Sequence, residues 1–165
     1  MTATAYIGIG SNLGDKLSNC LKAIEAVDRV PDCSVVGQSG FYRTEPVGVE
    51  RQDWYVNGVL FLSTDISPQD LLTSILAVEK EMGRKRNKKW ASRIIDLDLL
   101  LFGQDVIKKD DLAIPHPLMH RRRFVLMPMV QLAPDLIHPV LGKSMADLLD
   151  DISDEGQTVI PLTDI

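Results

Sequence analysis

Two aspartates placed two residues apart inside an apolar run are the side chains of this sequence most suited to chemistry. They are Asp96 and Asp98. Side chains along a β-strand alternate between its two faces, so both carboxylates should share one face while Ile95, Leu97 and Leu99 point to the other, into a core. Neighbouring carboxylates repel each other unless a cation or a proton lies between them. Mg²⁺ typically takes one or two carboxylates together with substrate phosphates, so the pair predicts a magnesium site.

Basic residues are concentrated near this acidic pair. The chain holds 18 Lys and Arg against 23 Asp and Glu, a net charge of −5. Half of these cations fall in two short stretches, Arg84, Lys85, Arg86, Lys88, Lys89 and Arg93, and Arg121, Arg122 and Arg123. An acidic protein with local basic clusters favours a small anionic ligand over a long polyanion. Acids next to bases therefore indicate a metal-dependent enzyme that acts on a nucleoside triphosphate.

Each half of this pattern also has a simpler interpretation. An Asp-x-Asp pair can lie on a solvated edge strand, although the apolar flanks here favour a central strand. A basic stretch on its own is more often a solvated loop or a nucleic-acid patch. Only the combination of acids and bases points to phosphate and metal chemistry.

Length and composition limit the class of protein. The chain has 165 residues, 45% of them hydrophobic and 25% charged, which fits one soluble globular domain spanning residues 1–165. Two cysteines are too few for a disulfide framework and predict reduced thiols in a cytoplasmic protein. The sequence shows no secretory leader and no apolar span of 18 residues, so we expect no membrane partner.

The hydrophobic pattern predicts a β-α-β-β-α-β order. Asp15 can cap the first helix, which Pro31 ends, and Ser67 with Pro68 can start the second, which Gly83 ends. Strands are expected over residues 3–10, 34–43, 55–64 and the segment with the paired aspartates, followed by a turn at 102–106 into a short strand, and by helices over 121–132 and 144–151. This order predicts an α+β fold, a ferredoxin-like sandwich of an antiparallel sheet and helices, with a C-terminal extension.

A glycine-rich segment follows the first strand, Gly8-Ile9-Gly10-Ser11-Asn12-Leu13-Gly14. It can be interpreted as a phosphate-binding loop, which would suit a Rossmann-type nicotinamide oxidoreductase. That class also needs an acid at the end of the next strand and a parallel sheet, and neither is predicted here. A tight turn is the simpler role for Gly14.

A turn-rich segment, Phe41-Tyr42-Arg43-Thr44-Glu45-Pro46-Val47-Gly48, precedes the aromatic start of the next strand, Trp54-Tyr55-Val56-Asn57. Tyr55 and Asn57 share one strand face and could stack on and hydrogen-bond a flat heterocycle. Aromatic residues at strand starts are, taken alone, more often part of the core.

Together these segments resemble the 6-hydroxymethyl-7,8-dihydropterin pyrophosphokinase family of folate biosynthesis. The resemblance runs from about Tyr6 to Pro139 and is most specific at Trp90-Ala91-Ser92-Arg93-Ile94-Ile95-Asp96-Leu97-Asp98-Leu99-Leu100-Leu101-Phe102-Gly103, with Gly83-Arg84, Ile114-Pro115-His116-Pro117 and Arg122-Arg123-Phe124 in support. It departs from the family pattern at Glu45, where a second proline is sometimes found, and at Asp111 and Ala113.

The resemblance implies transfer of the pyrophosphoryl group of ATP to the hydroxymethyl oxygen of the pterin, with release of AMP. It implies that Asp96 and Asp98 hold two Mg²⁺ ions and that Arg84 and Arg93 stabilise the transferring group. Further ATP contacts are implied for Glu79, Arg86, Lys89, Trp90, Leu99, His116 and Arg122, and the pterin pocket for Thr44, Val47, Tyr55, Asn57, Trp90 and Phe124. ATP and the pterin would be the partners of a monomer, without nucleic acid.

An RNA-binding module is the alternative outside the enzymes, since ferredoxin-like sheets also carry RNA-recognition domains. Those domains need exposed aromatics on central strands within an RNP pattern, and this sequence has none. Its paired aspartates would repel phosphate without a metal.

Overall fold

The computed structural model describes residues 2–45, 54–83, 94–152 and 158–162. Four α-helices, one 3₁₀ helix and eight strands occur in these ranges. In chain order they are β1 (Ala3–Ser11), α1 (Lys16–Asp28), β2 (Cys33–Gln38), β3 (Tyr42–Thr44), β4 (Tyr55–Thr64), α2 (Pro68–Glu81), β5 (Asp96–Phe102), β6 (Ile107–Lys108), β7 (Ala113–Ile114), η1 (Met119–Arg121), α3 (Arg123–Leu132), α4 (Met145–Asp151) and β8 (Val159–Pro161).

The main sheet has six strands, all paired antiparallel, in the order β5-β1-β4-β3-β8. β2 and β3 both pair with β4, at different parts of its length, and β1 pairs with β4 as well. β4 is therefore the strand with the most partners in this sheet. The predicted strand over 55–64 agrees with β4. β6 and β7 form a separate two-stranded hairpin.

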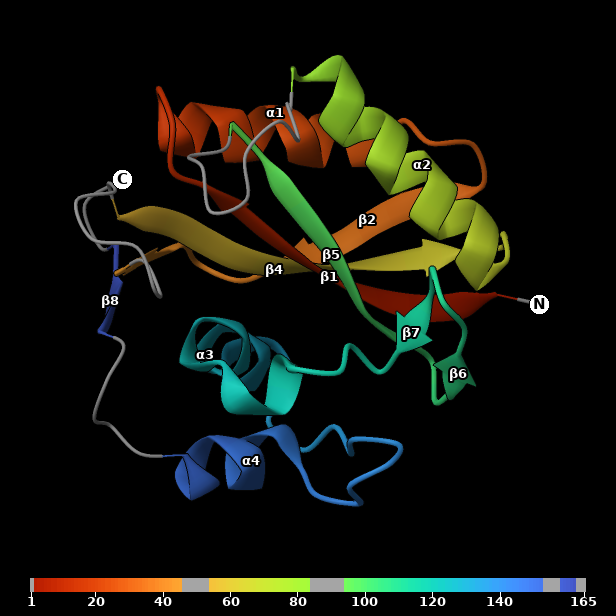
Figure 1. The fold of residues 1–165 in the computed structure, drawn as a ribbon, viewed down its shortest axis with the longest axis vertical. Helices are drawn as coiled ribbons and strands as arrows, with labels where there is room; N and C mark the ends of the chain where they lie inside the picture. Colours follow the sequence, from red (N-terminus) through yellow and green to blue (C-terminus); the bar gives the residue numbers. More distant parts are fainter. Residues whose placement is uncertain (1, 46–53, 84–93, 153–157, 163–165) are drawn as a thin grey trace.

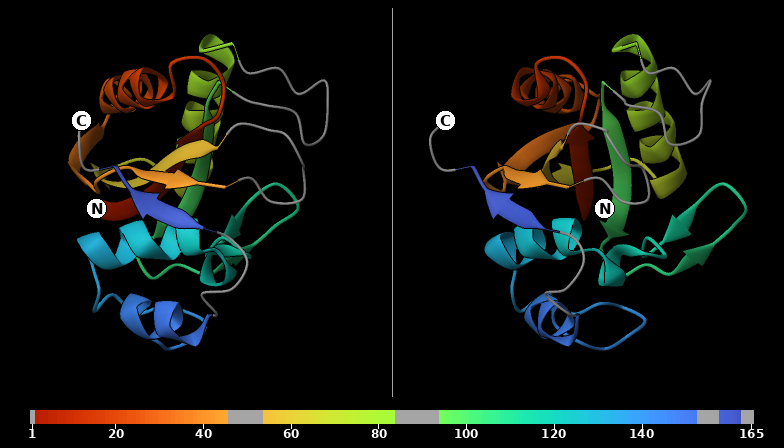
Figure 2. Two further views of the ribbon diagram at one scale, coloured as in Figure 1. Left: turned by 90° about the vertical axis from the view of Figure 1, so that its left-hand side faces the viewer. Right: turned by 60° about the vertical axis from the view of Figure 1, so that its left-hand side comes forward.

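Helices cover both faces of the sheet. α1 and α2 lie on one face, α3 lies against the other, and α4 packs on the far side of α3 (Figure 1). The turned views show the same layers (Figure 2). The core accordingly divides into two clusters, one between the sheet and α1 and α2, the other between the sheet, α3 and α4. No helix in the described ranges has the length and apolar character of a membrane span.

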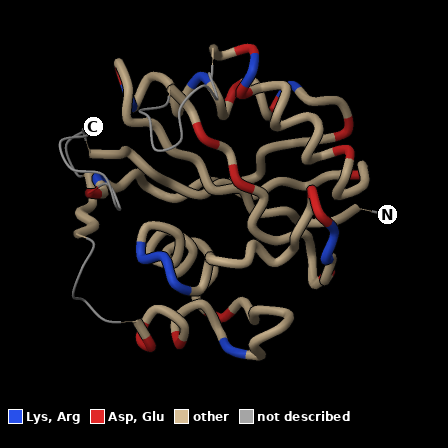
Figure 3. The backbone as a smooth tube through the Cα atoms, viewed as in Figure 1, with Lys and Arg blue, Asp and Glu red and all other residues tan. Residues whose placement is uncertain are grey.

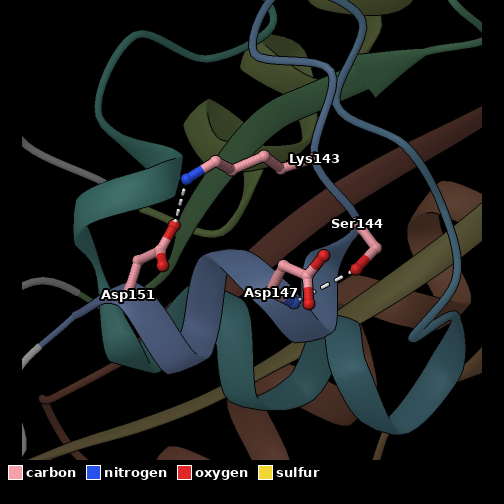
Figure 4. Close-up of polar contacts among 4 residues, drawn as sticks. All are labelled: Lys143, Ser144, Asp147 and Asp151. Atoms are coloured by element: carbon pink, nitrogen blue, oxygen red, sulfur yellow. Dashed lines mark hydrogen bonds and ion pairs between the residues drawn. The ribbon is translucent and has the colours of Figure 1, made fainter.

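Side-chain caps start α1 and α2 at the residues that the sequence predicts. Asp15 accepts a hydrogen bond from the Ser18 backbone N–H (3.2 Å), and Ser67 accepts one from Asp70 (3.1 Å). Gly83 follows α2 with a φ of 87°, a conformation that glycine adopts without strain. The last helix is capped by Ser144 and bridged by an ion pair of 2.7 Å between Lys143 and Asp151 (Figure 4).

Three local expectations need correction. The strand expected over 34–43 is two strands, β2 and β3, because Ser39 turns inward and its hydroxyl accepts the Val59 N–H (2.9 Å). The helical spacing of apolar residues in α1 also predicts that Leu21 is buried with Ile24 and Val27. Ile24 and Val27 are buried, but Leu21 is 44% exposed and the smaller Cys20 and Ala23 complete the buried face instead. Additional short strands, β7 and β8, were not predicted.

The strand that carries the paired aspartates is at the edge of the sheet and not in its centre. In the described ranges β5 pairs with β1 alone. The apolar sequence of β5 therefore does not come from a central position in the sheet. It arises because a hydrophobic cluster packs against each face of the strand. Leu97 and Leu99 belong to the cluster under α1 and α2, whereas Leu100 and Leu101 belong to the cluster with α3 and α4.

Candidate active site

The two aspartates of β5 share one face of the strand, as the alternation predicts. Both side chains are partly exposed, while Leu97 and Leu99 between and after them are 4% and 5% exposed. The backbone N–H of Leu97 donates a hydrogen bond of 2.8 Å to the Glu79 carboxylate on α2. The residue between the aspartates is therefore fixed by a buried side chain of the neighbouring helix.

A continuous row of residues crosses four strands beside Asp96. The strand registers pair Asp96 with Gly10 on β1, Gly10 with Asn57 on β4, and Asn57 with Tyr42 on β3. Residues directly opposite each other in a sheet point to the same face. Neighbouring strands lie about 4.8 Å apart, so the backbones of Asp96 and Asn57, two strands apart, are separated by about 10 Å. Gly10 lies between them. The row thus places an acidic position and an amide on one face without a bulky side chain in between.

Gly10 is required by this arrangement. A Cβ atom at residue 10 would come within 2.6 Å of the Asn57 side-chain nitrogen Nδ2, closer than Cβ contacts in proteins. At Gly8, opposite Asp98, the nearest atoms would be Leu100 methyl groups at 3.6 and 3.7 Å, an ordinary contact. The glycine-rich segment is therefore mainly strand, and Gly10 makes room for Asn57. Only Gly14, with a φ of 70°, takes the turn role expected of it.

Thr44 and Asn57 each carry a buried polar atom that lacks a hydrogen-bond partner in the described ranges. Thr44 is 1% exposed and Asn57 8%. Thr44 Oγ1 and Asn57 Oδ1 are buried without a hydrogen-bond partner in the described part of the chain. An unsatisfied buried polar atom costs about 1–3 kcal/mol, so such atoms indicate a functional site. Tyr55 pairs with Thr44 across β3 and β4, which brings three of the predicted pterin-binding residues together.

His116, which is predicted to bind the triphosphate, lies near both Asp98 and Arg122. Burial lowers the pKa of His116, the charge of Asp98 raises it, and that of Arg122 lowers it. His116 Nδ1 accepts the Leu118 backbone N–H (3.2 Å), which leaves Nε2 as the free nitrogen of the ring. The guanidinium of Arg122 lies over the Phe124 ring, 5.5 Å from its centre. Figure 3 shows basic residues gathered where α3 begins.

Two of the residues expected at the nucleotide have their side chains in the interior. Glu79 is 2% exposed and accepts the Leu97 N–H, and the Leu99 side chain belongs to the core under α1 and α2. Their contacts with ATP stay predictions. The other predicted site residues, Val47, Arg84, Arg86, Lys89, Trp90 and Arg93, lie outside the described residues.

The donor set suits Mg²⁺ held jointly with a phosphate ligand. Asp96 and Asp98 offer carboxylate oxygens on one partly exposed strand face. Neither at this position nor elsewhere in the described ranges do three or more His, Cys, Asp or Glu side chains lie close enough together to hold an ion by themselves. Mg²⁺ commonly binds to one or two carboxylates and completes its octahedron with water and substrate phosphates. The residues present therefore fit the ion that the sequence predicts.

Sequence reasoning did not assign roles to Tyr42 and Gly10. Tyr42 lies opposite Asn57 and its hydroxyl donates to Gln131 Oε1 on α3 (2.8 Å), which ties the end of that helix to β3. A signal for Gly10 was present, because a glycine inside a strand, here one residue before its end, often marks close approach of another group. The group that approaches Gly10 is the Asn57 side chain, and its position there depends on the register between β1 and β4.

Known proteins resemble this sequence over most of its length. Residues 6–134 match the model of the family described as 7,8-dihydro-6-hydroxymethylpterin-pyrophosphokinase (HPPK). The chain is 40% identical over 145 residues to the 2-amino-4-hydroxy-6-hydroxymethyldihydropteridine pyrophosphokinase of Aquifex aeolicus, covering 88% of this chain and 89% of the relative. The enzyme of the same name from Pseudomonas aeruginosa is 38% identical over 161 residues, or 98% of this chain and 99% of that one.

Solved structures share the fold at low sequence identity. Wild-type HPPK-DHPS of Plasmodium falciparum with pteroate superposes with a TM-score of 0.75 at 14% identity, over 91% of this chain. This chain spans only 42% of that longer protein. The family match and the two bacterial relatives assign the sequence without depending on this likeness. The chain belongs to the 7,8-dihydro-6-hydroxymethylpterin-pyrophosphokinase family.

Proposed function

We propose a residue-level account of the reaction that family membership assigns to this chain, the transfer of pyrophosphate from ATP to the hydroxymethyl group of 6-hydroxymethyl-7,8-dihydropterin in folate biosynthesis. Asp96 and Asp98 hold two Mg²⁺ ions on the β5 face. When bound, the ions neutralise charge on the phosphates and help to align the attacking oxygen with the β-phosphorus. The partial exposure of both aspartates on one strand face supports this role.

The pterin lies on the β3–β4 side of the same sheet face. Thr44 and Asn57 offer a hydroxyl and an amide to the polar edge of the ring, and Tyr55 and Phe124 enclose its faces. The two buried polar atoms without partners, Thr44 Oγ1 and Asn57 Oδ1, support this placement. Val47 and Trp90 complete the pocket by resemblance alone.

The triphosphate extends from the pterin side towards β5 and the start of α3. His116 and Arg122 donate hydrogen bonds to its oxygens, since the occupied Nδ1 of His116 leaves Nε2 for the ligand. Arg84 and Arg93 stabilise the transferring group, with further contacts from Glu79, Arg86, Lys89, Trp90 and the Leu99 segment. The chemistry then depends on positioning and on electrostatic stabilisation, without a dedicated catalytic base.

Several broader features of the protein belong to the same proposal. The order β5-β1-β4 with β2 beyond it, and α1 and α2 on one face, supports a ferredoxin-like sandwich to which α3, α4 and β8 add a C-terminal extension. We take residues 1–165 as one catalytic domain, a monomer that works in the cytoplasm without nucleic acid or membrane. The two free buried cysteines support a reducing compartment.

The cross-strand row from Asp96 through Gly10 to Asn57 carries the proposal, because its two ends are a proposed metal ligand and a proposed pterin contact on one face of the sheet. Product analysis with ATP, Mg²⁺ and the pterin tests it. We expect AMP and pterin pyrophosphate in equal amounts, and no turnover without a divalent cation. ADP as the product would indicate γ-phosphoryl transfer and would contradict the account.

A further inference from the structure

We propose that the C-terminal strand β8 is a positioning element of the pterin pocket, and that Glu45 fixes it there. The inference rests on the proposed role of Thr44 in binding the pterin. It concerns residues that contact neither substrate in that proposal, in the part of the sequence for which no role was predicted.

β8 completes the hydrogen bonding of β3. β3 is only three residues long, with β4 on one side and β8 on the other. The β8 register places Thr44 opposite Val159 and Tyr42 opposite Pro161. Beyond the paired residues, the Leu162 N–H donates to the Phe41 carbonyl oxygen at 2.9 Å. Without β8, this side of β3 would be an open edge. Figure 2 shows β8 lying alongside β3 in both views.

Glu45 holds the entry of β8 at two points. Its backbone N–H donates to the Thr158 carbonyl oxygen (3.1 Å), and its side-chain oxygen Oε1 accepts the Thr158 N–H (2.6 Å). The second bond has a charged acceptor, and such bonds are shorter and stronger than neutral ones. Since Thr158 immediately precedes β8 and Glu45 immediately follows β3, the clamp sets the register of the two strands.

The clamp lies next to the residue whose position matters for the pterin. Glu45 follows Thr44, whose buried hydroxyl has no partner in the described ranges, and Val159 opposite Thr44 is 9% exposed. A strand of three residues held on one side only is marginal. Loosening β8 should therefore let Thr44 shift against Asn57. Asp96 and Asp98 lie on β5, separated from β3 by β1 and β4, so the metal side should be unaffected.

The test compares pterin and ATP affinities in clamp variants. Glu45→Ala should raise the KM for the pterin about five- to tenfold, the effect of losing one charged hydrogen bond, with kcat and the KM for ATP changed less than about twofold. Glu45→Gln keeps an oxygen that can accept the Thr158 N–H and should recover most of the loss. Asp151→Ala is the matched control, because Asp151 also accepts a hydrogen bond near the C-terminus but contacts Lys143.

A second variant removes the other partner of the same bond. Thr158→Pro deletes the N–H that Glu45 accepts and should reproduce the effect of Glu45→Ala, while the double variant should show no further loss. Additive effects, or equal changes in the KM for ATP and for the pterin, would overturn the proposal.

Calorimetric Kd values for the pterin, measured with a nonhydrolysable ATP analogue present, provide a readout that does not need turnover. If the wild type binds the pterin without transferring pyrophosphate, the proposed function fails. A weaker pterin Kd in Glu45→Ala would still support the clamp in that case, and an unchanged Kd would overturn it.

Discussion

The Glu79 carboxylate accepts a hydrogen bond of 2.8 Å from the backbone N–H of Leu97. Leu97 lies between Asp96 and Asp98 on an edge strand, so this donor points away from the partner strand β1. A helix side chain that is 2% exposed thereby takes the place of a neighbouring strand. The spacing of the two proposed metal ligands depends on a residue that is buried behind them.

Removing that carboxylate should affect both stability and metal binding. Glu79→Ala leaves a buried N–H without its partner and should lower the free energy of unfolding by about 1–3 kcal/mol. It should also raise the Mg²⁺ concentration needed for half-maximal rate, because the backbone between the two ligands is freed. Glu79→Gln keeps an acceptor oxygen and should be milder.

Glu81→Ala is the control for this prediction, since Glu81 is an exposed acid on the same helix. Urea unfolding and Mg²⁺ titration of the rate measure the two effects. A Glu79→Ala protein with the stability and Mg²⁺ requirement of the control would refute the positioning role.

Thr44 and Thr64 provide a matched pair of buried threonines. The Thr64 hydroxyl lies 3.0 Å from Cys33 Sγ and accepts the Ile66 N–H at 3.3 Å, whereas Thr44 Oγ1 has no partner in the described ranges. Thr44→Val should therefore leave stability unchanged or raise it, and weaken pterin binding about tenfold. Thr64→Val should lose about 1–3 kcal/mol of stability and keep pterin affinity. Thermal unfolding and pterin calorimetry separate these outcomes, and a destabilised Thr44→Val protein with normal pterin affinity would contradict the pocket.

Gly10 and Gly8 give a second matched pair on β1. Gly10→Ala places a methyl group 2.6 Å from Asn57 Nδ2 and should displace that side chain, raising the KM for the pterin about tenfold or more. Gly8→Ala adds the same methyl group at ordinary contact distances and should change the pterin KM far less. Steady-state kinetics on the two variants is sufficient. Equal effects would mean that the space beside Asn57 has no special role.

His138 should make stability depend on pH. Burial lowers its pKa below the ordinary value of 6.5, and the nearby His120 lowers it further. Because the folded state then binds fewer protons than the unfolded state, stability is greatest above pH 6.5 and falls as the pH drops below it. Protonation also removes the acceptor of the Val140 and Leu141 N–H groups, which Nδ1 now accepts at 3.2 and 3.1 Å.

His138→Asn keeps an acceptor oxygen without the titration. Urea unfolding at pH 7.5 and pH 5 should show a smaller loss at acid pH in this variant than in the wild type. Some loss should remain, because burial also lowers the pKa of His116. An acid-induced loss in His138→Asn as large as that of the wild type would contradict the assignment.

The sequence predicted those parts of the fold that depend on local pattern. Alternation placed Asp96 and Asp98 on one face, and the caps at Asp15 and Ser67 follow from hydrogen bonds within one helical turn. The edge position of β5 could not be predicted, because an apolar strand between two helical layers has the same composition as a central one. Strand order decides between them, and it depends on pairing between distant segments.

Residue types and their spacing were enough to propose candidate site residues, whereas contacts that depend on strand register could not be predicted. The carboxylate pair and the Tyr55 and Asn57 face were visible in the sequence. The place of Gly10 beside Asn57 depends on the pairing of β1 with β4, and the contact of Glu45 with Thr158 joins residues 113 positions apart. Contacts between residues so far apart in the sequence cannot be predicted from a local sequence pattern.

The most direct test of the central claim is AMP formation by Asp96→Asn and Asp98→Asn, with Asp105→Asn as an exposed control just after β5. Asparagine keeps the shape of each side chain and removes its charge. We predict that both variants fold and bind the pterin but lose at least about 10²-fold in rate, while the control stays within about twofold of the wild type. Wild-type rates and an unchanged Mg²⁺ requirement in both variants would show that these aspartates do not hold the metal, and would contradict the account.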